Sequence, residues 1–368
     1  MVPAKPKLVH LQTLRGLAAS AVVATHAVEY PIRRGLLPEE FYRLAWALGW
    51  LGVAVFFVIS GLIMIHSADR EFGSAEAARR FALRRVVRVV PLYWLATIPF
   101  AVAQVARGEA LTADMVVRSL LFIPYAGTGM EAARPIVGQG WTLNYEMLFY
   151  VLFTATLLLP RRIGLPVLLG FFPLVIALRS LVWPLVPYRD PTSPLPFWSD
   201  PITLLFVIGL VIGLVQLRRT QWHQVRHPVA GTVAVLGAAI AIFLAAGGGF
   251  PMPVWWQALF AVAGGLSAWL CTSHAGHRYP RAGLVAEAAG DASYSTYLFH
   301  PLMLMVLYAV WERTPLAAMR AGPALFVALA LVACNVGGWL IFRWLERPLT
   351  RRLAALTGRK RPPLPVVA

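Results

Sequence analysis

The feature that most constrains this chain is a series of apolar stretches that recurs about every 20 to 35 residues between Leu8 and Leu345. Each stretch is long enough to cross the hydrocarbon core of a bilayer, which takes about 20 residues of α-helix. The predicted spans are about 8–29, 46–66, 87–106, 141–160, 164–183, 199–217, 229–247, 254–272, 293–311 and 323–345. The sequence therefore predicts an all-α, polytopic membrane protein with about ten transmembrane helices.

The composition supports a membrane protein over a soluble one. Hydrophobic residues make up 59% of the chain and charged residues only 13%, whereas soluble proteins average about 25% charged residues. The intervals between spans leave no room for a soluble domain, so we expect one integral-membrane domain over residues 1–350. A basic, Pro-rich tail, 351–368, should follow it, extended and solvated at its end. The two cysteines lie within predicted spans and indicate no disulfide framework.

The formal charge of +17 is explained by orientation in a membrane. Of the 33 Lys and Arg residues, 21 lie in segments on the same side as the N-terminus and 9 on the other side. Basic residues concentrate on the cytoplasmic side of membrane proteins. We therefore expect both termini in the cytoplasm, and the positive charge calls for no nucleic-acid partner.

The first span carries two ionisable residues, Arg15 and His26, within its apolar run. Eleven residues are close to three helical turns, so both side chains share one face, roughly 16 Å apart along the axis. Ionisable groups in a spanning helix usually face a protein interior or a wet cavity. A neutral imidazole can take a proton from an alcohol that attacks a carbonyl. The alternative for His26 is a structural histidine that is hydrogen-bonded inside the bundle.

Glu146 follows the residues WTLNY at the outer end of the fourth span. His26 lies near the outer end of the first span, so the two are predicted to share a depth. A carboxylate beside an imidazole would orient the ring and stabilise its cation. A structural hydrogen bond to a neighbouring helix is the equally open alternative for Glu146.

A cluster of arginines, Arg84, Arg85 and Arg88, stands at the inner mouth of the third span, just before Tyr93. Guanidinium groups match the geometry of phosphate, so a phosphorylated ligand from the cytoplasm would suit them. Contact with lipid headgroups is the ordinary alternative for arginines at this depth. We also expect Ser74 to cap a short interfacial helix over AEAARRFALRR. The 34-residue outer loop 107–140 is either a cover for a site or a passive linker.

Ser60 and His300 are two further candidate residues. Ser60 and Gly61 in the second span are small and favour close helix packing over a catalytic serine. His300 lies about seven residues into the ninth span, toward its inner half, where it lines the same cavity or bonds to a neighbouring backbone. No HExxH pattern occurs, and the pair His274 and His277 has no evident carboxylate partner, so no metal site is expected.

Six blocks in order make the chain resemble the membrane acyltransferase-3 family, and within it the exopolysaccharide-production (ExoZ-like) branch. They are LRGLAASAVVATH, GWLGVAVFFVISGLIM, RRVVRVVPLYW, GQGWTLNYEMLFY, DASYSTYLFH and the closing LERP, spread from residue 14 to 348. An arginine, ten residues and a histidine alone would be a weak signal. The six blocks together are specific and cover nearly the whole chain.

The resemblance implies a ten-helix enzyme of the bacterial inner membrane that moves an acyl group, usually acetyl, from cytoplasmic acyl-CoA to a saccharide hydroxyl. By resemblance, His26 is the catalytic histidine, Arg15 its paired arginine and Glu146 the glutamate of the tryptophan block. Acetyl-CoA is the expected donor and a polysaccharide or lipid-linked repeat unit the acceptor, with membrane lipids around. The residues expected to contact the donor are Arg15, Arg84, Arg85, Arg88, Tyr93, Ser60 and His300.

Two other functions remain open from the sequence. In a transporter or flippase of a saccharide, Arg15, His26 and Glu146 would bind substrate or relay protons. In a non-catalytic subunit of an export complex, replacement of His26 would have no effect. The lack of an evident internal repeat slightly weakens the transporter.

Overall fold

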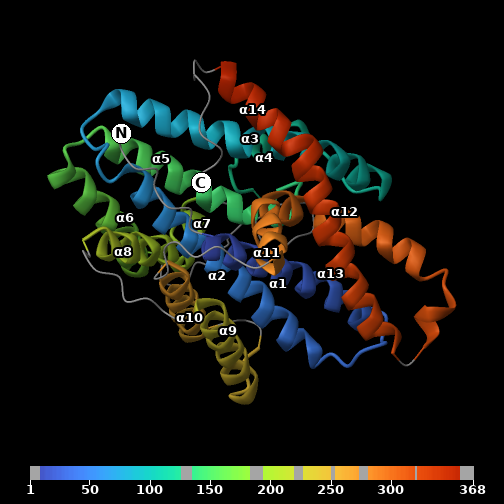
Figure 1. The fold of residues 1–368 in the computed structure, drawn as a ribbon. Helices are drawn as coiled ribbons and strands as arrows, with labels where there is room; N and C mark the ends of the chain where they lie inside the picture. Colours follow the sequence, from blue (N-terminus) through green and yellow to red (C-terminus); the bar gives the residue numbers. More distant parts are fainter. Residues whose placement is uncertain are drawn as a thin grey trace. The chain divides into compact units, whose positions relative to one another are not determined.

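The computed structural model describes residues 9–125, 135–182, 194–218, 227–249, 253–272, 281–319 and 321–356, and these are helices joined by turns and loops (Figure 1). The α-helices are α1 (Val9–Arg33), α2 (Phe41–Ala68), α3 (Ala75–Ala106), α4 (Ala113–Leu120), α5 (Trp141–Leu157), α6 (Arg161–Val182), α7 (Pro194–Trp198), α8 (Leu204–Arg218), α9 (Pro228–Ala245), α10 (Val254–Thr272), α11 (Arg281–Asp291), α12 (Ser293–Trp311), α13 (Gly322–Ile341) and α14 (Arg347–Leu356). Three 3₁₀ turns, η1 (Gly138–Gly140), η2 (Pro201–Thr203) and η3 (Pro315–Ala318), and a π-helical turn, η4 (Phe342–Glu346), complete the described elements. The predicted all-α fold is confirmed for these ranges, which contain no strand.

Each of the ten predicted spans overlaps a helix of the described chain. Six helical segments are long and apolar enough to cross a membrane within the described part of the chain: Phe41–Ala68, Ala75–Ala106, Arg161–Val182, Pro194–Arg218, Pro228–Ala245 and Gly322–Leu356. The count of ten spans and the cytoplasmic position of both termini stay predictions. The end of the predicted tail, 357–368, lies outside the described residues, and 351–356 belong to α14.

The short interfacial helix expected after Ser74 is wrong as a separate element. Ser74 does cap a helix, since its Oγ accepts a hydrogen bond from the backbone N–H of Ala77 at 3.2 Å. The helix then runs on without a break to Ala106, over 32 residues. At about 1.5 Å per residue that is roughly 48 Å, longer than a bilayer core. The helix continues through Pro91 and Pro99, so the basic segment around Arg85 and the apolar span belong to one helix.

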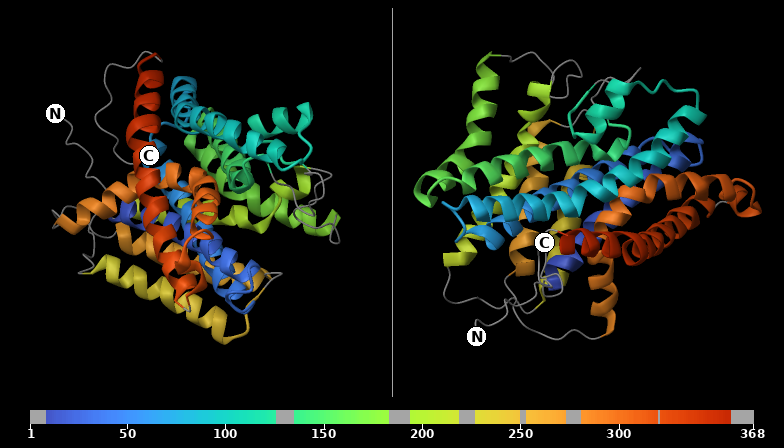
Figure 2. Two further views of the ribbon diagram at one scale, coloured as in Figure 1. Left: turned by 90° about the vertical axis from the view of Figure 1, so that its right-hand side faces the viewer. Right: turned by 90° about the horizontal axis from the view of Figure 1, so that it is seen from above.

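The chain divides into two compact units. The first comprises 9–59 and 211–347 of the described chain, and the second comprises 60–210 and the start of the C-terminal segment. In the first unit α1 is the hub, packed against α9, α10, α11, α12 and α13. α12 lies alongside α13, and α9 alongside α10 (Figure 2).

Apolar side chains and glycines hold the hub in place. Val23 and Ala27 of α1 share a buried core with Leu304 and Trp311 of α12 and with Phe326, Ala330 and Cys334 of α13. At Gly290 of α11 a Cβ would lie only 2.1 Å from the carbonyl oxygen of Gln12. The absence of a side chain there lets α11 lie directly on the N-terminal half of α1.

The second unit is built around α3 and α5, which pack side by side (Figure 1). Its core is aromatic: Phe81 stacks on Phe153 at 4.8 Å, and Phe149 on Phe206 at 4.4 Å between ring centroids. A Cβ at Gly61 would lie 2.1 Å from the carbonyl oxygen of Phe206. The close helix packing predicted for the Ser60–Gly61 pair is therefore confirmed at Gly61.

Candidate active site

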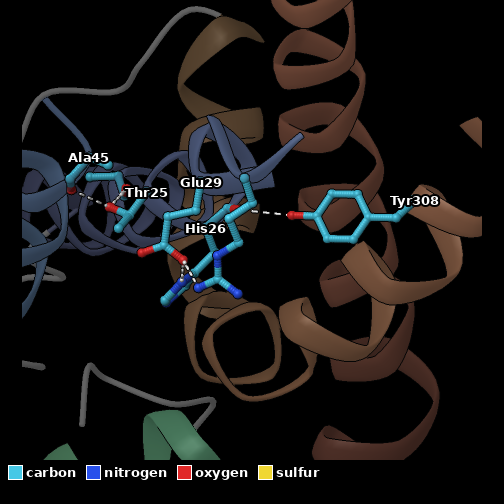
Figure 3. Close-up of polar contacts among 7 residues, drawn as sticks. Thr25, His26, Glu29, Ala45 and Tyr308 are labelled. Atoms are coloured by element: carbon cyan, nitrogen blue, oxygen red, sulfur yellow. Dashed lines mark hydrogen bonds and ion pairs between the residues drawn. The ribbon is translucent and has the colours of Figure 1, made fainter. Parts of the chain in front are cut away.

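His26 lies on α1 in the first unit, with its side chain 40% exposed. Its Nδ1 lies 3.3 Å from Oε2 of Glu29, one helical turn further along the same helix (Figure 3). Residues three apart on a helix are neighbours on its surface, so this contact follows from the local sequence. The imidazole is thus partly accessible and has a carboxylate beside it.

The backbone around His26 is tied to two neighbouring helices. The hydroxyl of Tyr308 in α12 donates to the carbonyl oxygen of His26 at 2.7 Å (Figure 3). Thr25 donates through Oγ1 to the carbonyl oxygen of Ala45 in α2 at 3.0 Å. These hydrogen bonds hold the helical turn that carries the imidazole in place. Buried backbone carbonyls need a hydrogen-bond donor, so both contacts should persist.

The imidazole of His300 in α12 stacks on that of His26, with ring centroids 5.2 Å apart and an interplanar angle of 22°. His300 is fully buried, and its Nδ1 lies 2.8 Å from the carbonyl oxygen of Tyr297. A carbonyl only accepts, so Nδ1 carries the proton. Nε2 of His300 is buried and has no hydrogen-bond partner in the structure.

The stacking of the two imidazoles corrects the predicted depth of His300 relative to His26. Counting from helix ends put His26 in the outer part of the first span and His300 in the inner half of the ninth. The two rings lie at one level, because α11 packs along the N-terminal half of α1 and α12 begins only beyond it. The structure places the His300 ring beside that of His26 and its Nδ1 against a backbone carbonyl, and a role in lining a substrate cavity stays a prediction.

An aromatic and ionic group closes the C-terminal end of α1. Tyr30 stacks on Tyr308 at 3.9 Å and donates a hydrogen bond to Glu312. Arg34 also donates to Glu312. These two hydrogen bonds hold the pKa of the Glu312 carboxyl below its ordinary value. The group fixes the C-terminal end of α12 against α1.

Arg15 lies at the other end of α1 and is buried. It donates through Nη1 to Oε1 of Gln12 at 3.2 Å, and Gln12 donates through Nε2 to Oδ1 of Asp291 at 2.9 Å. Arg15 and His26 belong to one continuous helix, as the spacing predicts. They stand in separate surroundings, Arg15 toward α11 and His26 toward α12.

The second unit holds the predicted glutamate. Glu146 on α5 accepts a hydrogen bond through Oε1 from Ser60 of α2 at 3.0 Å and another from Tyr150, one turn along α5. The structure thus brings together Ser60 and Glu146 of the predicted site residues. The carboxylate that His26 contacts in the structure is Glu29. Because Glu146 and His26 belong to different units, their pairing stays a prediction.

Arg85 on α3 is buried between two aromatic rings. Its guanidinium carbon lies 5.3 Å from the ring centroid of Phe81 and 5.6 Å from that of Tyr150. The charges of Arg88 and Glu146 act on it electrostatically. Its Nε is buried without a hydrogen-bond partner in the structure. Burying a guanidinium is costly unless aromatic faces or counter-charges offset the loss of water, and this environment supplies both.

The other predicted residues of α3 lie apart from this cluster. Arg84 forms an ion pair with Glu71 at 3.6 Å, and Tyr93 is fully buried with its hydroxyl 3.2 Å from Oγ of Ser119 in α4. Tyr93 therefore packs α4 onto α3, and its contacts in the structure are structural ones. Within the described residues no three His, Cys, Asp or Glu side chains gather closely enough for a metal ion, while His274 and His277 lie outside the described ranges.

Sequence reasoning missed Glu29 and Tyr150 as partners of the predicted residues. The available signal was local: Glu29 stands three residues after His26, and Tyr150 four residues after Glu146. Both spacings put the two side chains on one helical face. Asn144 was also missed, and its amide is buried with neither polar atom hydrogen-bonded in the structure. Nothing in its sequence position distinguishes it.

Comparison with known proteins gives one family and several relatives. Residues 9–343 match the family Acyl_transf_3, described as an acyltransferase domain. The chain is 34% identical to the exopolysaccharide production protein ExoZ of Rhizobium meliloti (strain 1021), over 85% of this chain and 95% of that one. It is 26% identical to the acyltransferase MdmB of Streptomyces mycarofaciens (97% and 95% covered) and 25% identical to nodulation protein 10 of Rhizobium leguminosarum bv. viciae (84% and 84%). No solved structure matches the chain significantly.

Proposed function

This chain belongs to the Acyl_transf_3 family of acyltransferases, and from that premise we propose that it moves an acetyl group from acetyl-CoA to a saccharide hydroxyl with His26 as the general base. As a member of the family it is a membrane acyltransferase that transfers groups other than aminoacyl groups. Family membership favours the enzyme over the transporter and over the non-catalytic subunit.

The observation that carries the proposal is the accessibility of one imidazole in a stacked pair. His300 is fully buried, whereas the His26 side chain is 40% exposed. A general base must reach the proton that it abstracts within hydrogen-bond distance. Of the two rings, only His26 offers an accessible edge to a substrate.

The proposed reaction is a direct transfer. The saccharide hydroxyl attacks the thioester carbonyl while His26 takes its proton, and a tetrahedral intermediate forms. Collapse of that intermediate breaks the carbon–sulfur bond, and the CoA thiolate leaves with the proton from the imidazolium. An ester and free CoA are the products. General base catalysis of this kind contributes about 10²- to 10⁴-fold in rate.

The phosphate charges of the proposed donor explain why arginines would line its binding site. CoA carries several phosphate charges, and guanidinium groups bind phosphate through charge-assisted hydrogen bonds. Arg85, Arg88 and Arg15 are the proposed contacts for its nucleotide end. The excess of basic residues on the N-terminal side supports a cytoplasmic donor and a bacterial inner-membrane location.

A saccharide acceptor is proposed from the relatives. The relative ExoZ is named for exopolysaccharide production, and it matches over nearly its whole length. The acceptor hydroxyl would then belong to a polysaccharide or to its lipid-linked repeat unit.

The test is acetyl transfer in proteoliposomes that contain purified protein, labelled acetyl-CoA and polysaccharide extracted from a strain that lacks this protein. We expect label on the saccharide with the unmodified chain and a loss of at least about 10²-fold with His26→Ala. His227→Ala is the matched control, since His227 is exposed at the start of α9 and its side chain caps nothing. Movement of saccharide without consumption of acetyl-CoA would overturn the proposal in favour of transport. Full transfer by His26→Ala would remove His26 from the mechanism.

A further inference from the structure

We propose that Glu29 is the positioning residue for His26 and that Arg33 weakens its effect by sharing the same carboxylate oxygen. The inference rests on the proposed role of His26 as the base. It assigns two residues that the family motifs in this sequence leave out, since both lie beyond the block that ends at His26.

The geometry comes from one face of α1. Nδ1 of His26 lies 3.3 Å from Oε2 of Glu29, and Nη2 of Arg33 lies 3.3 Å from the same Oε2. The three residues follow one another at spacings of three and four, which places them along one side of the helix. The carboxylate is the least exposed of the three, because the Glu29 side chain is 19% exposed, that of His26 40% and that of Arg33 70%.

A carboxylate beside Nδ1 decides where the ring carries its proton. An ionised carboxylate only accepts hydrogen bonds, so the neutral imidazole of His26 must present Nδ1–H to Glu29. Its Nε2 is then left with a free lone pair, which is the state that a general base needs. After proton transfer the negative charge of Glu29 also stabilises the imidazolium, as the carboxylate of a catalytic triad does.

Arg33 acts in the opposite direction. Its guanidinium shares Oε2 with His26 and adds a positive charge to the site where the imidazolium forms. Because Arg33 is largely exposed, solvent screens this charge and its effect should be the smaller of the two.

The other titratable groups around this row do not supply a competing charge. His300 and Tyr308 lie beside it on α12, Cys334 on α13 acts on Tyr308, and Tyr30 lies on α1 itself. Phenols and thiols are mostly neutral near pH 7. Glu312, at the end of α12, is engaged with Tyr30 and Arg34. Glu29 and Arg33 are therefore the carboxylate and the guanidinium in direct contact along this row.

The first test measures acetyl transfer against pH in proteoliposomes for four proteins: the unmodified chain, Glu29→Gln, Arg33→Gln and the control Glu40→Gln. Glu40 is exposed in the turn after α1. We expect Glu29→Gln to lower kcat about tenfold or more with KM for acetyl-CoA within about twofold, because the ring loses its orientation and the imidazolium its counter-charge. The midpoint of the acid limb should move about half a pH unit lower in Glu29→Gln and by less, but higher, in Arg33→Gln. Glu40→Gln should match the unmodified chain.

The opposite direction of the two shifts is the part that a merely structural role would not produce. Glu29→Gln with unchanged kcat and midpoint would overturn the proposal, as would shifts of both variants in the same direction. Loss of transfer in His26→Ala alongside an inert Glu29→Gln would leave the proposed function standing and this inference refuted.

A second measurement is independent of activity. ¹⁵N spectra of histidine-labelled protein in nanodiscs, with the His26 signals assigned by their loss in His26→Ala, report which ring nitrogen carries the proton. The unmodified chain should show His26 protonated at Nδ1, and Glu29→Gln should show a mixture. Protonation at Nε2 in the unmodified chain would refute the positioning role even if the protein transfers acetyl groups. The spectra decide the question equally if no acceptor is acetylated.

Discussion

Each of the two units contains a cluster of ionisable side chains, and the two clusters differ in exposure and in the number of helices that contribute to them. In the first unit His26 and its carboxylate come from a single helix and are partly exposed. In the second unit the cluster of Ser60, Glu146, Tyr150 and Arg85 is assembled from α2, α3 and α5, and Arg85 is 4% exposed. A guanidinium keeps its charge at any pH of interest.

This difference separates two tasks. A group that exchanges a proton with a substrate must be reachable, which suits the first cluster. A permanent charge enclosed by aromatic rings is suited to hold an anion or to specify a packing arrangement, which suits the second. Substitutions in the two clusters should therefore affect different kinetic or thermodynamic quantities.

The largest expected effect comes from removing the buried charge of Arg85 in the second unit. Arg85→Gln should raise KM for acetyl-CoA about 10- to 100-fold, because a charge-assisted hydrogen bond to phosphate is worth roughly 1.5–3 kcal/mol. It should change kcat by only a few-fold, whereas His26→Ala acts on kcat. The measurement is a set of steady-state curves at varied acetyl-CoA. Arg107→Gln is the control, since Arg107 is exposed in the loop after α3 and pairs with Glu109.

A result in which Arg85→Gln lowers kcat and leaves KM unchanged would contradict the donor-binding role. Because the substitution also removes a buried cation from between two rings, its thermal midpoint must be measured in parallel. Arg85→Lys, which keeps the charge but not the planar fork, should recover only part of the affinity.

A smaller effect tests whether the second cluster acts as one unit. Tyr150→Phe removes the donor of the hydrogen bond between Tyr150 and Glu146, Glu146→Gln removes the negative charge of its acceptor, and each should destabilise the protein by about 1–2 kcal/mol. If the two groups are coupled, the double substitution should cost less than the sum by at least about 0.5 kcal/mol. Denaturation of the detergent-solubilised protein gives the three values. Strict additivity would show that the carboxylate and the phenol contribute separately.

The smallest expected effect distinguishes the two stacked imidazoles. His300→Phe keeps an aromatic face against His26 and should reduce kcat by no more than about threefold, whereas His300→Ala should reduce it about tenfold, in line with an aromatic contact worth 0.5–1.5 kcal/mol. Initial rates at saturating acetyl-CoA separate the outcomes. Equal losses in the two variants would instead indicate that the imidazole of His300 itself contacts a substrate.

Much of the local structure could be predicted from the sequence. Apolar runs bounded by Pro and Gly mark helices, and 293–311 coincides with α12 residue for residue. The N-cap at Ser74 was equally readable, because a serine before a helical segment satisfies a free backbone N–H. The end of that helix was not, because an amphipathic basic segment and an apolar span look like two elements by composition, whereas the structure continues one helix through Pro91 and Pro99.

The sequence predicted several residues of the candidate site, but it did not predict which side chains they contact. His26, Arg15 and His300 follow from ionisable residues inside apolar runs. Which side chain each one meets depends on the relative axial positions of neighbouring helices, and hydropathy does not contain that information. The depth of His300 was missed for this reason, because α11 displaces α12 along α1.

The sequence by itself determined that this is an all-helical acyltransferase of the membrane type, because helix formation and the family motifs depend on residues close together in the chain. Tertiary structure decided that Arg15 reaches Asp291 through Gln12, that His26 stacks on His300, and that Glu146 accepts from Ser60. Those pairings depend on close approaches such as that of Gly290 to the backbone of Gln12. Packing at these few points sets the axial position of each helix against its neighbour. That position decides which side chains contact one another.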